Sequence, residues 1–104
     1  MNFDMTNYQY IVKQFKKPTA NQVYLLLGLS GEVGELHSKA AKHIRDETPE
    51  DRQALKDELG DVLWFVAMLA DIWGFELGEV AERNYLKLKD RAERNVIGGS
   101  GDNR

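Results

Sequence analysis

Two short pairs of acidic residues lie within the most apolar stretches of the chain. The pairs are Glu32-x-x-Glu35 and Glu58-x-x-Asp61. Residues three apart project from the same side of a helix, so each pair offers two carboxylates to one point. If the two pairs meet, each like-charged pair about 5 Å apart costs roughly 3 kcal/mol at an effective dielectric of about 20. Such an arrangement needs a cation, and a ligand set made of oxygen atoms favours a hard one such as Mg²⁺.

Helical periodicity places these acids relative to the apolar faces of the two helices that must carry them. The expected apolar stripe of the later helix consists of Leu55, Leu59, Val62, Val66, Leu69 and Trp73. Glu58 falls inside this arc, and Asp61 lies on its shoulder. On the earlier helix, Glu32 borders the apolar stripe and Glu35 lies further around the same shoulder. An acid in a core-facing stripe is rare unless it is paired or bound to a metal, so this pattern favours a metal site over a solvated surface.

Glycines surround the acids at positions 28, 31, 34 and 60. A glycine costs a helix interior about 1 kcal/mol relative to alanine, so each of them needs a reason. Close approach of two helices is one reason, and space for a ligand is the other. The sequence leaves both open.

The pattern of the whole chain is helical, and no strand alternation is visible. We expect helices over residues 5–15, from 19 or 21 to 45, from 49 to 73 and from 77 to 94. The third of them is expected to begin with Thr48 as its cap and Pro49 as its first residue, and to end before Gly74. Four helices joined by short loops predict an all-α fold, an antiparallel four-helix bundle. Residues 1–97 form the single expected domain, and the Gly-rich residues 98–104 form an irregular tail.

The composition is that of one ordinary globular domain. The chain has 104 residues, of which 42 % are hydrophobic and 30 % charged, with a formal net charge of −3. The slight negative charge gives no reason to expect a nucleic acid polymer or a membrane surface as partner. Cysteine is absent, which excludes disulfides, thiolate zinc sites and cysteine nucleophiles. No secretory signal or membrane-length apolar run is visible, so we expect a cytoplasmic protein.

A polar face on the fourth helix offers groups that can hold phosphate. Asn84, Lys87 and Arg91 follow one another at three- and four-residue spacing, which places them in line on one face. Their amide, ammonium and guanidinium groups suit a polyphosphate, since arginine donates bidentate hydrogen bonds; the alternative is a solvated helix face. Lys39 and Lys42 follow Glu35 by four and seven residues. They are either surface residues, with Lys39 paired to Glu35, or further phosphate contacts.

Three segments of the chain resemble the MazG-like family of all-α nucleoside triphosphate pyrophosphohydrolases. They are LLLGLSGEVGELHSKAAK, DELGDVLWFVAMLADIWG and LGEVAERNYLKLKDR, which together cover most of residues 25–91. The resemblance implies Mg²⁺-dependent cleavage, with Mn²⁺ as a possible substitute, between the α- and β-phosphates of a nucleoside triphosphate. The products would be a monophosphate and pyrophosphate. It also implies assembly into dimers or dimers of dimers, with sites near the subunit interfaces.

The same resemblance assigns a role to each candidate residue. The metal ligands would be Glu32, Glu35, Glu58 and Asp61. Glu35 and Glu58 would also be the catalytic carboxylates. The substrate-binding residues would be Asn84, Lys87 and Arg91, with Lys39 and Lys42 as further candidates. Some members carry an extra glutamate immediately before the first motif acid, where this chain has Gly31. That difference leaves open the number of metal ions and the identity of the general base.

The expected function is hydrolysis of (d)NTPs by a homo-oligomer, and two alternatives remain. One is a related pyrophosphohydrolase specialised for phosphoribosyl-ATP or a guanosine alarmone, because the sequence does not identify a base pocket. The other is a non-catalytic helical module that binds a nucleotide or a partner protein through its apolar faces. A four-acid set argues against the module, since binding alone does not require it.

Overall fold

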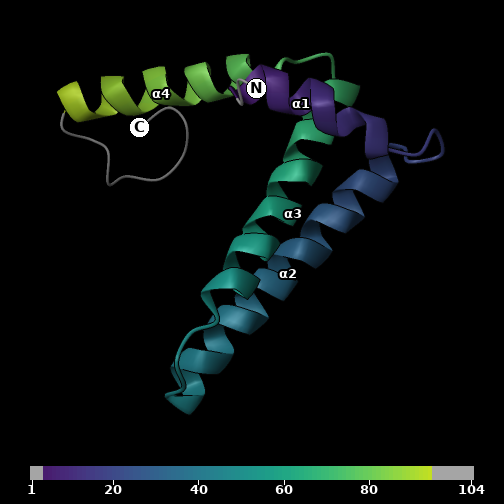
Figure 1. The fold of residues 1–104 in the computed structure, drawn as a ribbon. Helices are drawn as coiled ribbons and strands as arrows, with labels where there is room; N and C mark the ends of the chain where they lie inside the picture. The colour runs from purple at the N-terminus through teal and green to yellow at the C-terminus, as the bar shows by residue number, and fades with distance from the viewer. Residues whose placement is uncertain (1–3, 95–104) are drawn as a thin grey trace.

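The computed structural model describes residues 4–94, which form helices joined by short connections (Figure 1). The elements within this range are α1 (Met5–Val12), the 3₁₀ turn η1 (Lys13–Phe15), α2 (Gln22–Asp46), α3 (Arg52–Ile72) and α4 (Leu77–Glu93). The predicted all-α fold is confirmed. None of these helices is long and apolar enough to cross a membrane. The expected tail at 98–104 lies outside the described residues, and the single domain over 1–97 stays a prediction.

The helices α2 and α3 form a long antiparallel hairpin, and α1 packs across the end where α2 begins and α3 ends (Figure 1). The helix α4 contacts α1 and α3 near this end and then runs away from the hairpin instead of lying along it. The buried core therefore sits where the four helices meet. It consists of Leu25, Ala67, Met68, Leu69 and Leu77.

This core corrects the apolar stripe expected for α3. Leu69 is buried as expected, but Leu59 and Trp73 are exposed. Ala67 and Met68, which lie outside the expected stripe, are completely buried. The reason is that α1 covers a second face of α3 at its C-terminal end, whereas only α2 covers the remainder. The prediction of one apolar face on α3 therefore omitted the face that α1 covers.

The connection between α2 and α3 also differs from the expectation. Glu47 adopts a left-handed conformation with φ 54°, and the Thr48 N–H donates to the carbonyl of His43 at 3.0 Å. These residues therefore close the C-terminus of α2 in a Schellman-type cap. The expected start of α3 at Thr48 and Pro49 was wrong, because the cap is Asp51, which accepts a backbone N–H three residues later at 3.0 Å. The other end agrees with the sequence: Gly74, with φ 80°, follows the last turn of α3.

A buried glutamine connects α1 to the start of α4. Gln9 is only 6 % exposed. Its amide nitrogen donates to the carbonyls of Ala67 (3.1 Å) and Phe75 (3.0 Å). Its amide oxygen accepts the N–H of Leu77 at 2.8 Å. One side chain thus satisfies backbone groups at the end of α3 and the beginning of α4, which sets the direction in which α4 leaves the core.

Two further contacts hold α1 in place. The Thr6 hydroxyl accepts the backbone N–H of Gly78 at 3.0 Å, and a Cβ at that glycine would come within 2.5 Å of the hydroxyl oxygen. Lys13 forms an ion pair with Asp71 at 3.1 Å. The ion pair is exposed and contributes about 0–1 kcal/mol, so the buried hydrogen bonds are the stronger constraint.

We expect Gln9→Leu to lower the free energy of unfolding by about 2–3 kcal/mol, because leucine has a similar size but leaves buried backbone groups without partners. Tyr10→Leu is the matched control: its side chain is 80 % exposed, and its effect should stay within about 0.5 kcal/mol. Urea unfolding followed by circular dichroism measures both. Equal stability of the two variants would contradict the role given to Gln9.

Candidate metal centre

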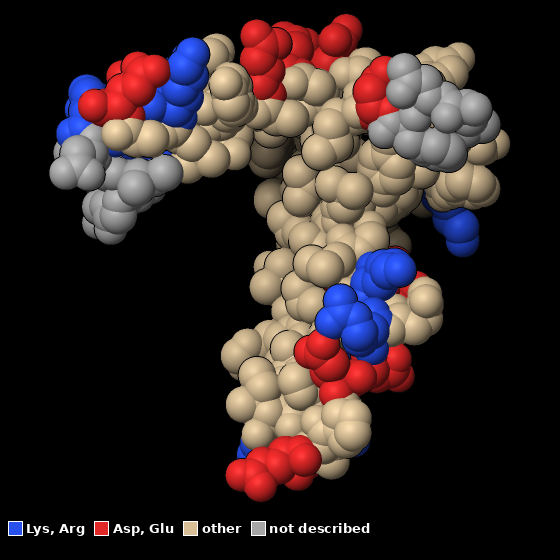
Figure 2. Space-filling view, turned by 60° about the vertical axis from the view of Figure 1, so that its left-hand side comes forward, with Lys and Arg blue, Asp and Glu red and all other residues tan. Residues whose placement is uncertain are grey.

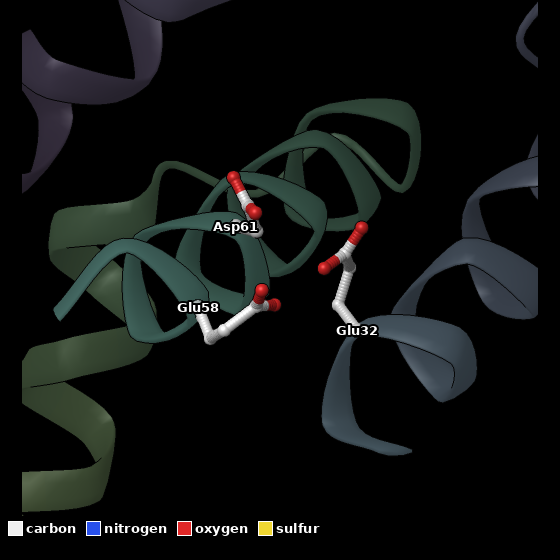
Figure 3. Close-up of side chains that lie close together, drawn as sticks. All are labelled: Glu32, Glu58 and Asp61. Atoms are coloured by element: carbon white, nitrogen blue, oxygen red, sulfur yellow. The ribbon is translucent and has the colours of Figure 1, made fainter. Parts of the chain in front are cut away.

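Three of the four predicted acids meet between α2 and α3. Glu32 projects from α2 toward Glu58 and Asp61 on α3 (Figure 3). One carboxylate oxygen from each residue lies within 4.8 Å of the others. Glu58 is 8 % exposed, Glu32 is half-buried and Asp61 is exposed. The burial of Glu58 and the shoulder position of Asp61 agree with the helical periodicity.

The local sequence explains this convergence. Glu58 and Asp61 are three residues apart, which puts both on one face of α3. The antiparallel pairing of α2 with α3 then places Glu32 opposite them. The packing of the two helices therefore brings the three carboxylates together.

Lys39 compensates part of the negative charge. Its ammonium donates to Oε1 of Glu58 at 2.6 Å. This hydrogen bond is the main reason why the pKa of Glu58 lies below its usual value, although burial acts in the opposite direction. The pKa of Glu32 is raised, first by burial and then by Glu58 and the other nearby carboxylates. Glu58 therefore keeps its charge readily, whereas Glu32 holds a proton more readily than a free glutamate.

The second oxygen of Glu58 supports a cation site. Oε2 is buried and has no hydrogen-bond partner among residues 4–94. A buried carboxylate oxygen normally has a donor or a metal, because desolvation is otherwise uncompensated. Three carboxylates from two helices supply the oxygen ligands that hard divalent cations prefer. The residues present therefore fit a divalent metal ion.

Glu35 lies outside this group of three. It is exposed on α2, and its negative charge contributes to raising the pKa values of Glu32 and Lys39. It is thus an electrostatic neighbour of the centre. The structure brings Glu32, Glu58 and Asp61 together as a set and leaves the fourth acid at their edge.

The predicted phosphate-binding residues fall into two places. Lys39 and Lys42 line a cavity of about 340 Å³ beside the hairpin turn. Asn84 and Lys87 line another cavity, of about 530 Å³, along α4. Arg91, on the same helix, is only 5 % exposed, so the face predicted to bind phosphate is buried at this residue.

The glycines near the acids have different roles. A Cβ on Gly28 would overlap the ring of Phe65, so this glycine allows α3 to approach α2. At Gly31, Gly34 and Gly60, a Cβ would meet no atom within 4 Å beyond the adjoining residues and the backbone of its own helix. Close packing, one of the two reasons that the sequence left open, therefore applies to Gly28. The other three glycines face open space, and its use by a ligand stays a prediction.

Sequence reasoning missed the partner of Lys39. It paired this lysine with Glu35, four residues earlier on the same helix, whereas the ammonium crosses to Glu58 on α3. A usable signal was present, because Lys39 follows Glu32 by seven residues and therefore shares its helix face. A lysine on the same helix face as Glu32 is therefore a candidate partner for the acids of α3 that lie opposite this face.

The chain matches a known family over most of its length. Residues 21–96 match the model of the MazG nucleotide pyrophosphohydrolase domain. The Gene 37 protein of Mycobacterium phage L5 is 49 % identical over 88 residues, a match that covers 78 % of this chain and 75 % of that protein. No solved structure matches the chain. The chain belongs to the MazG nucleotide pyrophosphohydrolase domain family, and the carboxylates described above all lie within the matched range.

We expect opposite effects from alanine at two of the glycines. Gly31→Ala should raise the free energy of unfolding by about 0.5–1 kcal/mol, because alanine favours the helix and the space is open. Gly28→Ala should lower it by about 1–3 kcal/mol, because the Phe65 ring must move. Thermal and urea unfolding measure both changes. If Gly28→Ala is as stable as Gly31→Ala, the close approach of α3 at this position is not a constraint.

Proposed function

We propose that the protein is a nucleotide pyrophosphohydrolase that uses Mg²⁺, or Mn²⁺ in its place, to cleave (d)NTPs between the α- and β-phosphates. The products are a nucleoside monophosphate and pyrophosphate. The observation that carries this proposal is the convergence of Glu32, Glu58 and Asp61 around a buried oxygen without a partner among the described residues. Membership of the family supports the class of reaction. A cytoplasmic location, where such nucleotides occur, stays a prediction.

The positions of the four acids support different roles in the proposed reaction. Glu32, Glu58 and Asp61, which converge in the structure, would hold the metal. Glu35 lies outside this group, and its role as a fourth ligand rests on the family resemblance alone. A bound divalent cation supplies positive charge against the polyphosphate and lowers the pKa of a bound water. Glu35, exposed at the edge of the group, is the acid that has no place among the three converging carboxylates. It is therefore the candidate general base.

The position of α4 indicates that its predicted phosphate-binding residues would serve the acids of a second copy of the chain. At 1.5 Å per residue, Asp61 lies roughly 15 Å before the end of α3, and Lys87 lies roughly 15 Å beyond the start of α4. Since α4 runs away from the hairpin (Figure 1), these two residues of one chain lie far apart. In a homodimer or homotetramer, Asn84 and Lys87 of one subunit can meet the acids of another, whereas Arg91, which is only 5 % exposed, lies at the buried end of the same face of α4.

An apolar surface supports this assembly. A cavity of about 360 Å³ between the hairpin and the start of α4 is lined entirely by apolar side chains, among them Leu26, Trp73 and Phe75. Figure 2 shows a long tract of the hairpin that bears neither acidic nor basic side chains. An apolar patch such as the lining of this cavity marks an interaction site in soluble proteins. A second copy would cover the tract and pair the cations of α4 with the acids of the hairpin.

The direct test incubates the purified protein with a panel of nucleotides and Mg²⁺ and identifies the products. The panel includes phosphoribosyl-ATP and a guanosine alarmone. Monophosphate and pyrophosphate should form, and chelation of the metal should stop the reaction. Glu58→Gln should lower kcat at least about 100-fold, because it removes a ligand charge at the centre. Asp57→Asn, which changes an exposed carboxylate on the same helix, should leave kcat unchanged. Saturable binding without product from any nucleotide would refute the enzyme and favour the binding module.

A mixing experiment tests whether the site is shared between subunits. Glu58→Gln and Lys87→Ala should each be nearly inactive alone. If one subunit supplies Glu58 and the other Lys87, random dimers of the two variants regain intact sites and about a quarter of wild-type activity. Light scattering establishes that the mixed sample is oligomeric. An oligomer without any regained activity would show that each chain forms its site alone.

A further inference from the structure

Lys39 stands between the metal centre and a neighbouring cavity. Its ammonium holds Oε1 of the buried Glu58 at 2.6 Å, while its own side chain is 43 % exposed. The same residue lines the cavity of about 340 Å³ at the turn of the hairpin, together with Lys42 and His43. The stem of a lysine has four flexible carbons, so its ammonium can turn from one place to the other without any movement of the backbone.

We propose that Lys39 is the resident cation of the carboxylate centre and that a divalent metal ion displaces it. A divalent ion bound at Oε2 of Glu58, the oxygen without a partner among the described residues, would share one carboxylate with the ammonium of Lys39 on Oε1. Charges of two and one about 5 Å apart repel by roughly 7 kcal/mol at an effective dielectric of about 20. The displaced ammonium then faces the cavity with Lys42, where it forms an anion site next to the metal. The exchange itself does not depend on the reaction; the identity of the anion, a substrate polyphosphate, rests on the proposed function.

The charges of the group are consistent with this exchange. Three carboxylates carry up to three negative charges, which one ammonium compensates only in part. The ion pair at 2.6 Å between the Lys39 ammonium and Oε1 of Glu58 holds this positive charge at the centre in the metal-free protein. Oε2 of the same glutamate is left without a partner among the described residues, which is expected if a single lysine replaces an ion that would bind several oxygens.

Lys39 is proposed both to compete with the metal and to contact the anion, so its removal should change the affinities for metal and anion in opposite directions. Removing the ammonium takes away the competitor of the metal, so the metal should bind more tightly. It also takes away a contact to the anion, so the anion should bind more weakly. A purely structural ion pair would not produce this combination.

The experiment titrates Mn²⁺ into metal-depleted wild-type protein, Lys39→Met and Lys42→Met by calorimetry. Lys39→Met should bind Mn²⁺ about tenfold more tightly, within the usual range of coupling between two sites. Lys42→Met loses the same charge next to the same cavity and should stay within about threefold of wild type, as expected of a weak surface effect. At saturating Mg²⁺, inorganic pyrophosphate should bind Lys39→Met more weakly than wild type.

Each result decides between the alternatives. Unchanged or weaker Mn²⁺ binding by Lys39→Met, or equal tightening by Lys42→Met, would overturn the exchange. Unchanged pyrophosphate affinity would overturn the movement of Lys39 into the cavity. Lys39→Arg, which keeps a cation at Glu58, should restore wild-type Mn²⁺ affinity and guards against a folding defect in the methionine variant. Because Mn²⁺ binding needs no nucleotide, hydrolysis without the expected affinity change refutes only the exchange. The affinity change without hydrolysis refutes only the proposed enzyme.

Discussion

The arrangement of this site depends on compensating the charge of one buried carboxylate, that of Glu58. Glu58 lies in the contact between α2 and α3, where an ionised acid is stable only beside a positive charge. Lys39 supplies that charge from the opposite helix, and its hydrogen bond keeps the pKa of Glu58 low. Glu32 and Asp61 add negative charge to the same point. The centre is therefore arranged for more positive charge than the described residues supply there, which is the physical basis for assigning it to a divalent ion.

The remaining parts of the fold bring the two helices together and direct the third. Gly28 lets Phe65 lie directly against α2, which keeps the facing acids close. At the far end, Gln9 ties the end of α3 to the start of α4. This glutamine lies in α1, before the range that matches the family model. The direction of α4, and with it the position of its cationic face, thus depends on a segment outside the part of the chain that defines the family.

Local sequence patterns predicted the helices well. They failed in the connection between α2 and α3, where the same residues could either end one helix or begin the next. Gly74 ends α3 as expected, because a left-handed residue there favours glycine. Thr48 and Pro49 predicted the start of α3, but the N–H of Thr48 completes the C-terminal cap of α2. Asp51 is the residue that caps the N-terminus of α3. Burial was predictable where one helix covers another, as at Glu58. It was not predictable at Met68, which is buried because α1, distant in the sequence, crosses a second face of α3.

The sequence by itself determined that the chain is helical, that two acid pairs lie on or beside apolar faces, and to which family they belong. Each of these follows from residue type and spacing along one helix. Only the tertiary structure decided which acids meet, that Lys39 reaches Glu58 instead of Glu35, and that α4 leaves the hairpin. Those outcomes depend on contacts between helices. Spacing within one helix specifies the face on which a residue lies, but not which neighbour packs against that face.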